Sequence, residues 1–244
     1  MTMMPSEDLI NLRFYLSGPL PCPYLPAQVE RKLFTYLRSD NGKNAEINGA
    51  LCRAGFRRSQ DIVYRPACEA CNACIPVRVP VGAFLLTRSL RRVLARNDDL
   101  SWEQLPLQTS ADLFSLFCAY QKARHGDSDM VHMAEEDFAA MLCEGQADTR
   151  LYGLRGADGV LKGCILADRV GDGLSAVYSF FTPDEPHRSL GTMLILSLIG
   201  EARNQGLPFV YLGYWIAAAR KMSYKSRFQP MQVLNRDGWT WLEN

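Results

Sequence analysis

Apolar residues recur along the chain with two different periods, and the period indicates which elements to expect. Helical spacing is found over residues 26–37, 110–125 and 189–205, and shorter apolar segments at 44–54 and 135–143 are each followed by glycine. A helix with one buried face accounts for this spacing. We therefore expect a helix in each of these five segments.

Strand-like runs, rich in β-branched and aromatic residues, lie between the predicted helices. They occupy residues 60–66, 75–81, 150–155, 160–170, 174–181, 208–213 and 231–242. Glycine-containing turn signals separate the runs that follow residue 149, which predicts three antiparallel strands. The third of these leads through the helix at 189–205 to the run at 208–213, so a right-handed crossover should make these two strands parallel neighbours.

The order of these elements resembles the GCN5-related acetyltransferase-like fold, which places the chain in the α/β (α+β) class. We expect a small cysteine-containing N-terminal domain over residues 1–85 and an acetyltransferase-like C-terminal domain over residues 86–244. The basic stretch at 84–97, where the boundary is placed, fits either a strand running into a helix or a connector. Arg188 and Gly191 resemble the phosphate-binding loop of that superfamily, although Met193 stands where a second small residue is expected.

Charge is distributed unevenly, although the net charge of the 244 residues is only +1. Residues 30–96 carry thirteen Lys and Arg against five Asp and Glu, whereas residues 97–150 carry three against eleven. A basic N-terminal third suits a polyanion such as nucleic acid, and a set of solvated helix faces is the competing interpretation.

The chain contains no uncharged apolar stretch of eighteen residues, and its first residues do not follow the pattern of a secretory signal. We therefore expect a cytoplasmic protein with no membrane partner. In that compartment, eight cysteines favour metal ligands, catalytic thiols or small core residues over disulfide bonds.

Six ordered blocks of sequence resemble the arginyl-tRNA protein transferase family, and specifically its short bacterial branch, the aspartate/glutamate leucyltransferases. The blocks are PCPYLP at 21–26, GFRRSQDIVYRPACEACNACIPVRV at 55–79, YQKARHGDSDM at 120–130, YSFFTPDEPHRSLGTM at 178–193, YLGYWI at 211–216 and KMSYKSRFQP at 221–230. The resemblance implies transfer of leucine from leucyl-tRNA to the N-terminal amine of proteins that begin with Asp or Glu, which marks them for degradation by the N-end rule. It also implies that leucyl-tRNA and such proteins are the partners.

In such a reaction the free α-amine attacks the ester carbonyl of the aminoacyl-tRNA, so orientation and stabilisation of the oxyanion are the main tasks of the enzyme. No cofactor is required for this transfer. The candidate catalytic residues are Tyr214, Tyr224, Lys225 and Asp184. For the tyrosines the competing interpretation is the core of a strand, and for Asp184 it is a cap on the following turn.

An acceptor carboxylate and the tRNA phosphates both call for cationic side chains, and adenine calls for an aromatic surface. The candidates for substrate or tRNA binding are Arg57, Arg58, Tyr178, Arg188, Gly191, Tyr211, Lys221 and Arg227. The sequence does not separate phosphate binding from carboxylate binding. An exposed basic loop is the alternative for residues 221–230.

Three cysteines, Cys68, Cys71 and Cys74, lie within one short loop, and Cys22 belongs to another block of the same domain. Four thiolates can bind zinc or an iron–sulfur cluster. The resemblance implies such a site, since eukaryotic members of the family bind a cluster or metal through cysteines in this domain, but Leu25 replaces the second cysteine of their first block. Reduced, partly buried thiols are the alternative.

Two other functions remain open from the sequence. One is an N-acyltransferase that uses an acyl thioester on the same fold, and the incomplete phosphate loop weakens it. The other is a metal-stabilised RNA-binding module without catalysis, which the conjunction of YLGYWI and KMSYKSRFQP with a strand-helix-strand unit disfavours.

Overall fold

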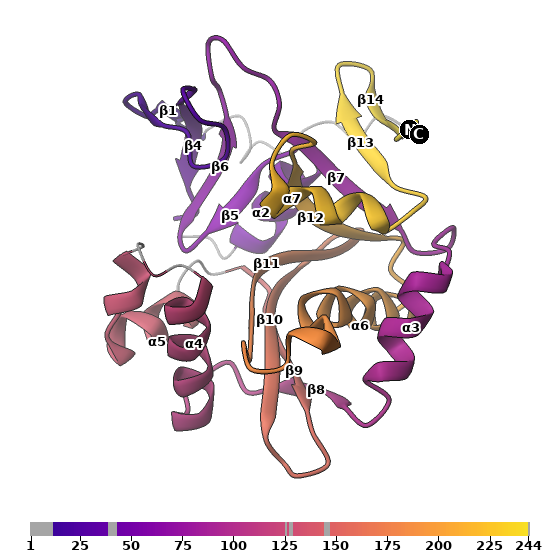
Figure 1. The fold of residues 1–244 in the computed structure, drawn as a ribbon. Helices are drawn as coiled ribbons and strands as arrows, with labels where there is room; N and C mark the ends of the chain where they lie inside the picture. The colour runs from indigo at the N-terminus through magenta and orange to yellow at the C-terminus, as the bar shows by residue number, and fades with distance from the viewer. Residues whose placement is uncertain (1–11, 39–42, 125, 127–128, 144–146, 244) are drawn as a thin grey trace.

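The computed structural model is built around an eight-stranded mixed β-sheet (Figure 1). The structure describes residues 12–38, 43–124, 126, 129–143 and 147–243, so the start of the chain, on which the secretory-signal prediction rests, lies outside the described residues. In spatial order the strands are β14 (Gly238–Trp241), β13 (Gln232–Asn235), β7 (Ile75–Pro80), β12 (Phe209–Trp215), β11 (Gly173–Phe181), β10 (Leu161–Val170), β9 (Thr149–Arg155) and β8 (Ser101–Leu105).

The predicted antiparallel strands are confirmed, and so is the parallel pairing of the two strands that a helix connects. Strand β10 pairs with β9 and with β11, both in antiparallel register. Helix α6 (Leu190–Asn204) connects β11 to β12, and these two strands pair in parallel. The parallel pairing extends only from Gly173↔Phe209 to Ser175↔Tyr211. Beyond Ser175 the two strands separate. The strand order agrees with the predicted α/β fold class and with the predicted acetyltransferase-like domain.

Helices cover both faces of this sheet. Helix α6 and helix α3 (Arg88–Arg96) pack on one face, whereas α4 (Ala111–Arg124) and α5 (Glu135–Cys143) pack on the other. Strand β10 alternates between the two cores, because Ile165 and Ala167 join the first, and Cys164 and Leu166 join the second. Among the described residues, no helix is long and apolar enough to cross a membrane.

A smaller sheet, ordered β1 (Tyr15–Leu16), β4 (Lys32–Tyr36), β6 (Ile62–Pro66) and β5 (Arg57–Ser59), is built by the N-terminal segment. Helix α2 (Asn44–Arg53) packs against both β5 and β10. A two-stranded ribbon of β2 (Leu20–Pro21) and β3 (Val29–Glu30) precedes β4.

The helix predicted over residues 26–37 is wrong, because this segment forms β3 and β4. Thr35 and Leu37 are each 2% exposed while Tyr36 between them is 37% exposed, which is the two-residue alternation of a strand. A short apolar run fits either period, and the partners β1 and β6 supply the backbone hydrogen bonds that decide the outcome.

The basic stretch at 84–97 contains a helix, α3, and not a connector alone. Four strands, β1, β2, β5 and β8, were not expected from the pattern. The division at residue 85 stays a prediction, and the large sheet crosses it, since β7 lies before this residue and pairs with both β12 and β13.

Candidate functional site

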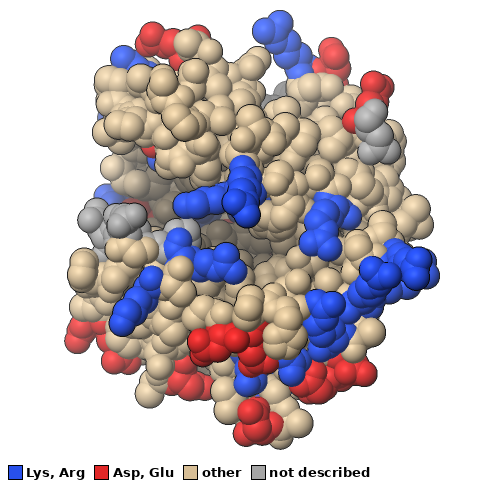
Figure 2. Space-filling view, in the orientation of Figure 1, with Lys and Arg blue, Asp and Glu red and all other residues tan. Residues whose placement is uncertain are grey.

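A cavity of about 760 Å³ opens where β11 and β12 separate. Its walls come from the second half of β11, the end of β12, the first turns of α6, the end of α4 and the segment formed by α7 (Arg220–Ser223) and η3 (Tyr224–Arg227). Figure 2 shows this cavity as a hollow with basic side chains around it. The cavity therefore lies toward the carboxyl-terminal ends of the two parallel strands, a common position for ligand sites in α/β folds.

Seven of the predicted site residues line this cavity. They are Arg57, Tyr178, Gly191, Tyr214, Lys221, Tyr224 and Lys225. They come from β5, β11, α6, β12, α7 and η3, so six separate elements converge on one space. This convergence of residues distant in sequence indicates a ligand site.

Lys225 is 7% exposed, and its Nζ donates a hydrogen bond to the backbone oxygen of Tyr214 at 2.6 Å. Burial, and then the neighbouring charge of Arg57, lower the pKa of Lys225 to about 7. Above that pH the side chain is a neutral amine, with a lone pair that can accept a proton. Lys225 can therefore act as a base near neutral pH.

Tyr214 does not offer its hydroxyl to the cavity. The group donates its single proton between the backbone oxygens of Gly55 at 3.0 Å and Tyr64 at 3.1 Å, and burial raises its pKa. The predicted role as oxyanion donor is therefore corrected. Tyr214 fixes the end of β12 to the N-terminal segment and presents its backbone oxygen to Lys225.

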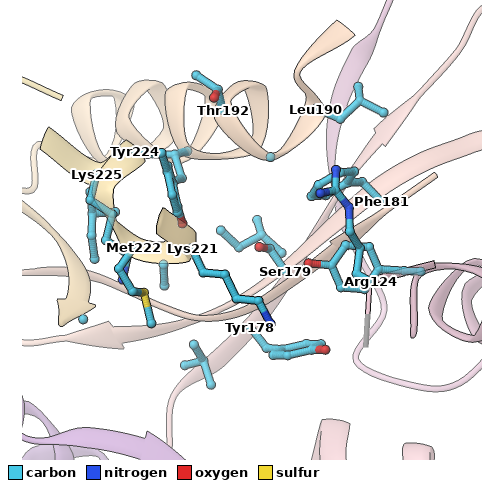
Figure 3. Close-up of a pocket in the computed structure, with 18 of the residues that line it drawn as sticks. Arg124, Tyr178, Ser179, Phe181, Leu190, Thr192, Lys221, Met222, Tyr224 and Lys225 are labelled. Atoms are coloured by element: carbon cyan, nitrogen blue, oxygen red, sulfur yellow. The ribbon is translucent and has the colours of Figure 1, made fainter. Parts of the chain in front are cut away.

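Two other tyrosines keep a proton to donate. Tyr224 extends over the cavity (Figure 3), and burial raises its pKa to about 12. Tyr178 also has a pKa of about 12 because it is buried, and its hydroxyl accepts a hydrogen bond from Gln121 at 2.6 Å, which leaves its own proton for a ligand. Both remain protonated near neutral pH.

Arg57 lies at the point where the two parallel strands part. One N–H donates to Ser175 Oγ at 2.8 Å and another to the backbone oxygen of Ala176, directly after the last parallel pair. Gly213 allows this position, because a Cβ there would lie 2.8 Å from Nε of Arg57 and the φ of Gly213 is +77°. The guanidinium thus fills the gap between the strands.

Lys221 and Arg124 approach the cavity from opposite walls. In Figure 3 Lys221 extends across the cavity toward Tyr178, and Arg124 lies beside Phe181, with its guanidinium carbon 5.8 Å from the ring centroid. Neither side chain forms an ion pair with another described residue. Together they bring two positive charges to the mouth of the cavity.

Five predicted site residues do not line the cavity. They are Arg58, Asp184, Arg188, Tyr211 and Arg227. Arg58 is buried against Asp168, with guanidinium-to-carboxylate distances of 2.6 and 2.7 Å. Tyr211 donates to Asp172, and Arg227 is exposed on η3. The predicted contacts of Arg58 and Tyr211 with a substrate are corrected, because structural partners already occupy both groups.

The predicted phosphate loop before α6 is also occupied by structural contacts. Arg188 holds Asp99 with two hydrogen bonds of 2.7 and 2.9 Å and pairs with Glu185. Gly191 is close to Phe181, since a Cβ there would lie 2.9 Å from the ring. Asp184 is exposed and bonds only to Thr182 among the described residues, as a turn-stabilising residue does.

Some residues of the cavity were not identified from the sequence. They are Tyr24, Tyr64, Tyr120, Arg124, Arg220 and Met222. Most of them lie within the blocks that carry the family resemblance, so those blocks were the signal that could have found them. Arg220 directly precedes the last block.

The four clustered cysteines line a second cavity, of about 270 Å³. It shares Tyr24, Tyr64 and Tyr214 with the first cavity, so the two are neighbours. Burial, followed by the charges of the other three thiols, raises the pKa of Cys74 to about 11. Among the described residues, no three ligands already stand close enough to hold a metal ion.

Comparison with known proteins identifies both halves of the chain. Residues 20–92 match the family model described as arginine-tRNA-protein transferase, N terminus, and residues 112–235 match the corresponding C-terminus model. A protein of Paramagnetospirillum magneticum named aspartate/glutamate leucyltransferase is 49% identical over 93% of this chain and 92% of its own length. One of Methylorubrum extorquens with the same name is 47% identical over 98% of this chain and 100% of its own length.

Solved structures give weaker matches. The crystal structure of FemX is 10% identical, with a TM-score of 0.46 over 85% of this chain and 80% of that one. The C-terminal domain of a putative lysylphosphatidylglycerol synthetase from Agrobacterium fabrum is 19% identical, with a TM-score of 0.45 over 62% of this chain and 50% of that one.

Proposed function

Since the chain belongs to the arginine-tRNA-protein transferase family, we propose that it transfers leucine from leucyl-tRNA to the N-terminal amine of proteins that begin with Asp or Glu. In this proposal the product is a protein marked for degradation by the N-end rule, and the enzyme works in the cytoplasm, where aminoacyl-tRNA is found. The residues that line the 760 Å³ cavity suit both the leucyl donor and the acidic acceptor.

The lining of the cavity favours leucine over arginine as the donor residue, and this observation carries the proposal. Ile165 on β10, Ile195 on α6 and Leu212 on β12 give it apolar lining. Among the described lining residues Glu185 is the single carboxylate, and Lys162 at 3.0 Å and Arg188 already neutralise it. A guanidinium donor would find no free carboxylate there, whereas a leucyl side chain finds apolar contacts.

The cations at the mouth fit the acceptor. In this proposal Lys221 and Arg124 bind the carboxylate of an N-terminal Asp or Glu, which needs a cationic partner when it leaves water. Its α-amine then lies between this pair and Lys225. A peptide that begins with Lys would be repelled by the same two charges.

The reaction can be followed by its bonds. The α-amine forms a bond to the leucyl carbonyl carbon, Tyr224 and Tyr178 donate hydrogen bonds to the oxyanion, and Lys225 takes the proton that the amine loses. When the ester bond breaks, Lys225 returns this proton to the ribose oxygen of the tRNA. Protons balance, and no cofactor takes part in these steps.

The direct test loads leucine, arginine or phenylalanine on tRNA and offers peptides that begin with Asp, Glu, Lys or Ala. We expect leucine to be transferred to the Asp and Glu peptides alone, measured as labelled product. If the folded, reduced protein transfers none of the three residues, the proposal fails. Retention of the protein on immobilised coenzyme A would then support the acyl-thioester alternative.

We also propose that Cys22, Cys68, Cys71 and Cys74 bind zinc or an iron–sulfur cluster, because all four thiols face one cavity. Binding has to draw the thiols together, since no three described ligands are at metal distance. We expect anaerobically purified protein to contain the metal, measured by elemental analysis and visible absorbance, and Cys71→Ser to lose it. Cys143→Ser changes a single exposed thiol on α5 and should keep the metal; equal metal content in both variants would reject the site.

A further inference from the structure

Helix α3 presents a basic face that the reaction at the cavity does not use. Its four arginines, Arg88, Arg91, Arg92 and Arg96, are all exposed, and the helix contains no acidic residue. At 100° per residue these side chains fall within one face, whereas Leu90 and Val93 on the opposite face are buried against the core. The buried face therefore fixes the arginines toward solvent.

Both ends of α3 are tied to segments that border the cavity. Before the helix, the backbone N–H of Leu85 donates to the oxygen of Gln229, shortly after η3. After the helix, Asn97 Nδ2 donates to the backbone oxygen of Arg188 at 2.9 Å, and Arg96 donates to that of His187. The positions of the arginines relative to the cavity are therefore set by the fold.

The basic face is continuous with the charge around the cavity. Figure 2 shows basic side chains that extend from the central hollow to the side where Figure 1 places α3, while acidic side chains gather along the lower edge. Helix α5, on the other side of the sheet, begins with the three acidic residues Glu135, Glu136 and Asp137. A large anion that reaches the cavity would thus be attracted to the α3 side and repelled from the α5 side.

We propose that α3 binds the acceptor stem of the donor tRNA, with Arg88, Arg91 and Arg92 contacting its phosphates. This inference rests on the proposed function, which places the aminoacylated 3′ end in the cavity and leaves the stem just outside it. The nine residues of α3 span about 14 Å. Arg88, Arg91 and Arg92 lie within about 6 Å along the helix axis, so their long side chains can contact neighbouring phosphates. Guanidinium groups suit phosphate oxygens, and double-stranded RNA is bound mainly through its backbone.

The test compares the double variant Arg88→Glu, Arg92→Glu with the wild type in the transfer of leucine from whole leucyl-tRNA. On the order of a tenfold rise in KM is expected for each arginine that no longer neutralises a phosphate, with kcat at saturating donor unchanged. The binding constant of deacylated tRNA should weaken in parallel, and its logarithmic dependence on salt should become shallower by about two units.

The control variant, Arg169→Glu with Arg236→Glu, makes the same change in net charge at exposed positions on β10 and in the β13–β14 turn. It should keep the KM and binding constant of the wild type. A donor without a stem, the leucyl ester of adenosine, should be used equally well by the wild type and both variants, and thermal melting checks that all three are folded.

The possible results distinguish the assignment of α3 from the proposed leucyl transfer. Wild-type KM and tRNA binding in the Arg88, Arg92 variant would overturn the assignment of α3, and so would a rise in KM for the acceptor peptide alone, which would make α3 a protein-binding surface. Equal loss with leucyl-adenosine would also overturn it, because the substitutions would then act on the cavity and not on a contact with the stem. If the wild type transfers no leucine, the proposed function fails, while tRNA binding that depends on Arg88 and Arg92 still supports the surface.

Discussion

Replacing Lys225 with methionine is expected to lower leucyl transfer by about 10²- to 10⁴-fold, the range for removal of a general base. Lys225 is buried in the wall of the cavity, with its Nζ held by the backbone oxygen of Tyr214 at 2.6 Å. Methionine retains an unbranched apolar stem of similar length, so the surrounding packing should survive. Single-turnover transfer with preformed leucyl-tRNA measures the loss.

The pH profile distinguishes a base from a residue that only fills space. Because the pKa of Lys225 is lowered to about 7, the wild-type rate should rise through this pH as the ammonium loses its proton. A second rise is expected at about 7.7 to 8.0, where the acceptor amine becomes neutral. Lys225→Met should keep only the second rise, and Lys225→Arg, which stays charged, should be at least as impaired.

The same group links stability to pH. The pKa of Lys225 is about 7 in the folded protein against an ordinary value of 10.5, so between these values the unfolded chain binds more protons. The free energy of unfolding should therefore rise with pH from 7 toward 10.5 in the wild type. Lys225→Met should remove this contribution, whereas the matched variant Lys122→Met, at an exposed position on α4, should keep both it and the activity. An unchanged rate in Lys225→Met would remove Lys225 from the mechanism.

The elements that the sequence predicted well are those in which local pattern and tertiary packing agree. Helix α6 has nine buried residues and is closed by Gly206, and the strands from β9 to β11 alternate between two cores. The segment at 26–37 failed because its apolar positions fit both periods, and strands β1 and β6, which decide the outcome, lie elsewhere in the chain.

The candidate site shows the same limit. The blocks located Lys221, Tyr224 and Lys225, which lie close together in sequence and line the cavity together. They could not show that Arg58 is neutralised by Asp168, a partner 110 residues away. Nor could they show that the hydroxyl of Tyr214 is bound to backbone oxygens of the N-terminal segment. Whether a polar side chain is free for a substrate depends on partners that only the fold brings together.

Replacing Arg57 with lysine is expected to reduce transfer by about 10²-fold, the loss that follows when the reacting groups are misplaced by about 1 Å. Lysine retains the charge but has no planar fork to bond Ser175 Oγ and the oxygen of Ala176 at once, so the gap between β11 and β12 loses its support. Because the charge of Arg57 also lowers the pKa of Lys225, displacement of this charge should shift the lower rise of the pH profile upward.

Gly213→Ala should impair transfer in the same way with Arg57 itself unchanged, because the added Cβ would lie 2.8 Å from Nε and push the guanidinium out of the gap. Alanine at a φ of +77° also costs roughly 1–2 kcal/mol of stability. Gly206→Ala controls for this strain, because its φ is +66° and a Cβ there meets nothing within 4 Å. We expect both variants to unfold at lower denaturant concentration, but only Gly213→Ala to lose transfer.

In an Arg57→Lys background, Gly213→Ala should add little further loss, because the clashing Nε is gone. Full activity in Gly213→Ala, or equal loss in Gly206→Ala, would show that the position of Arg57 between the strands does not control the reaction.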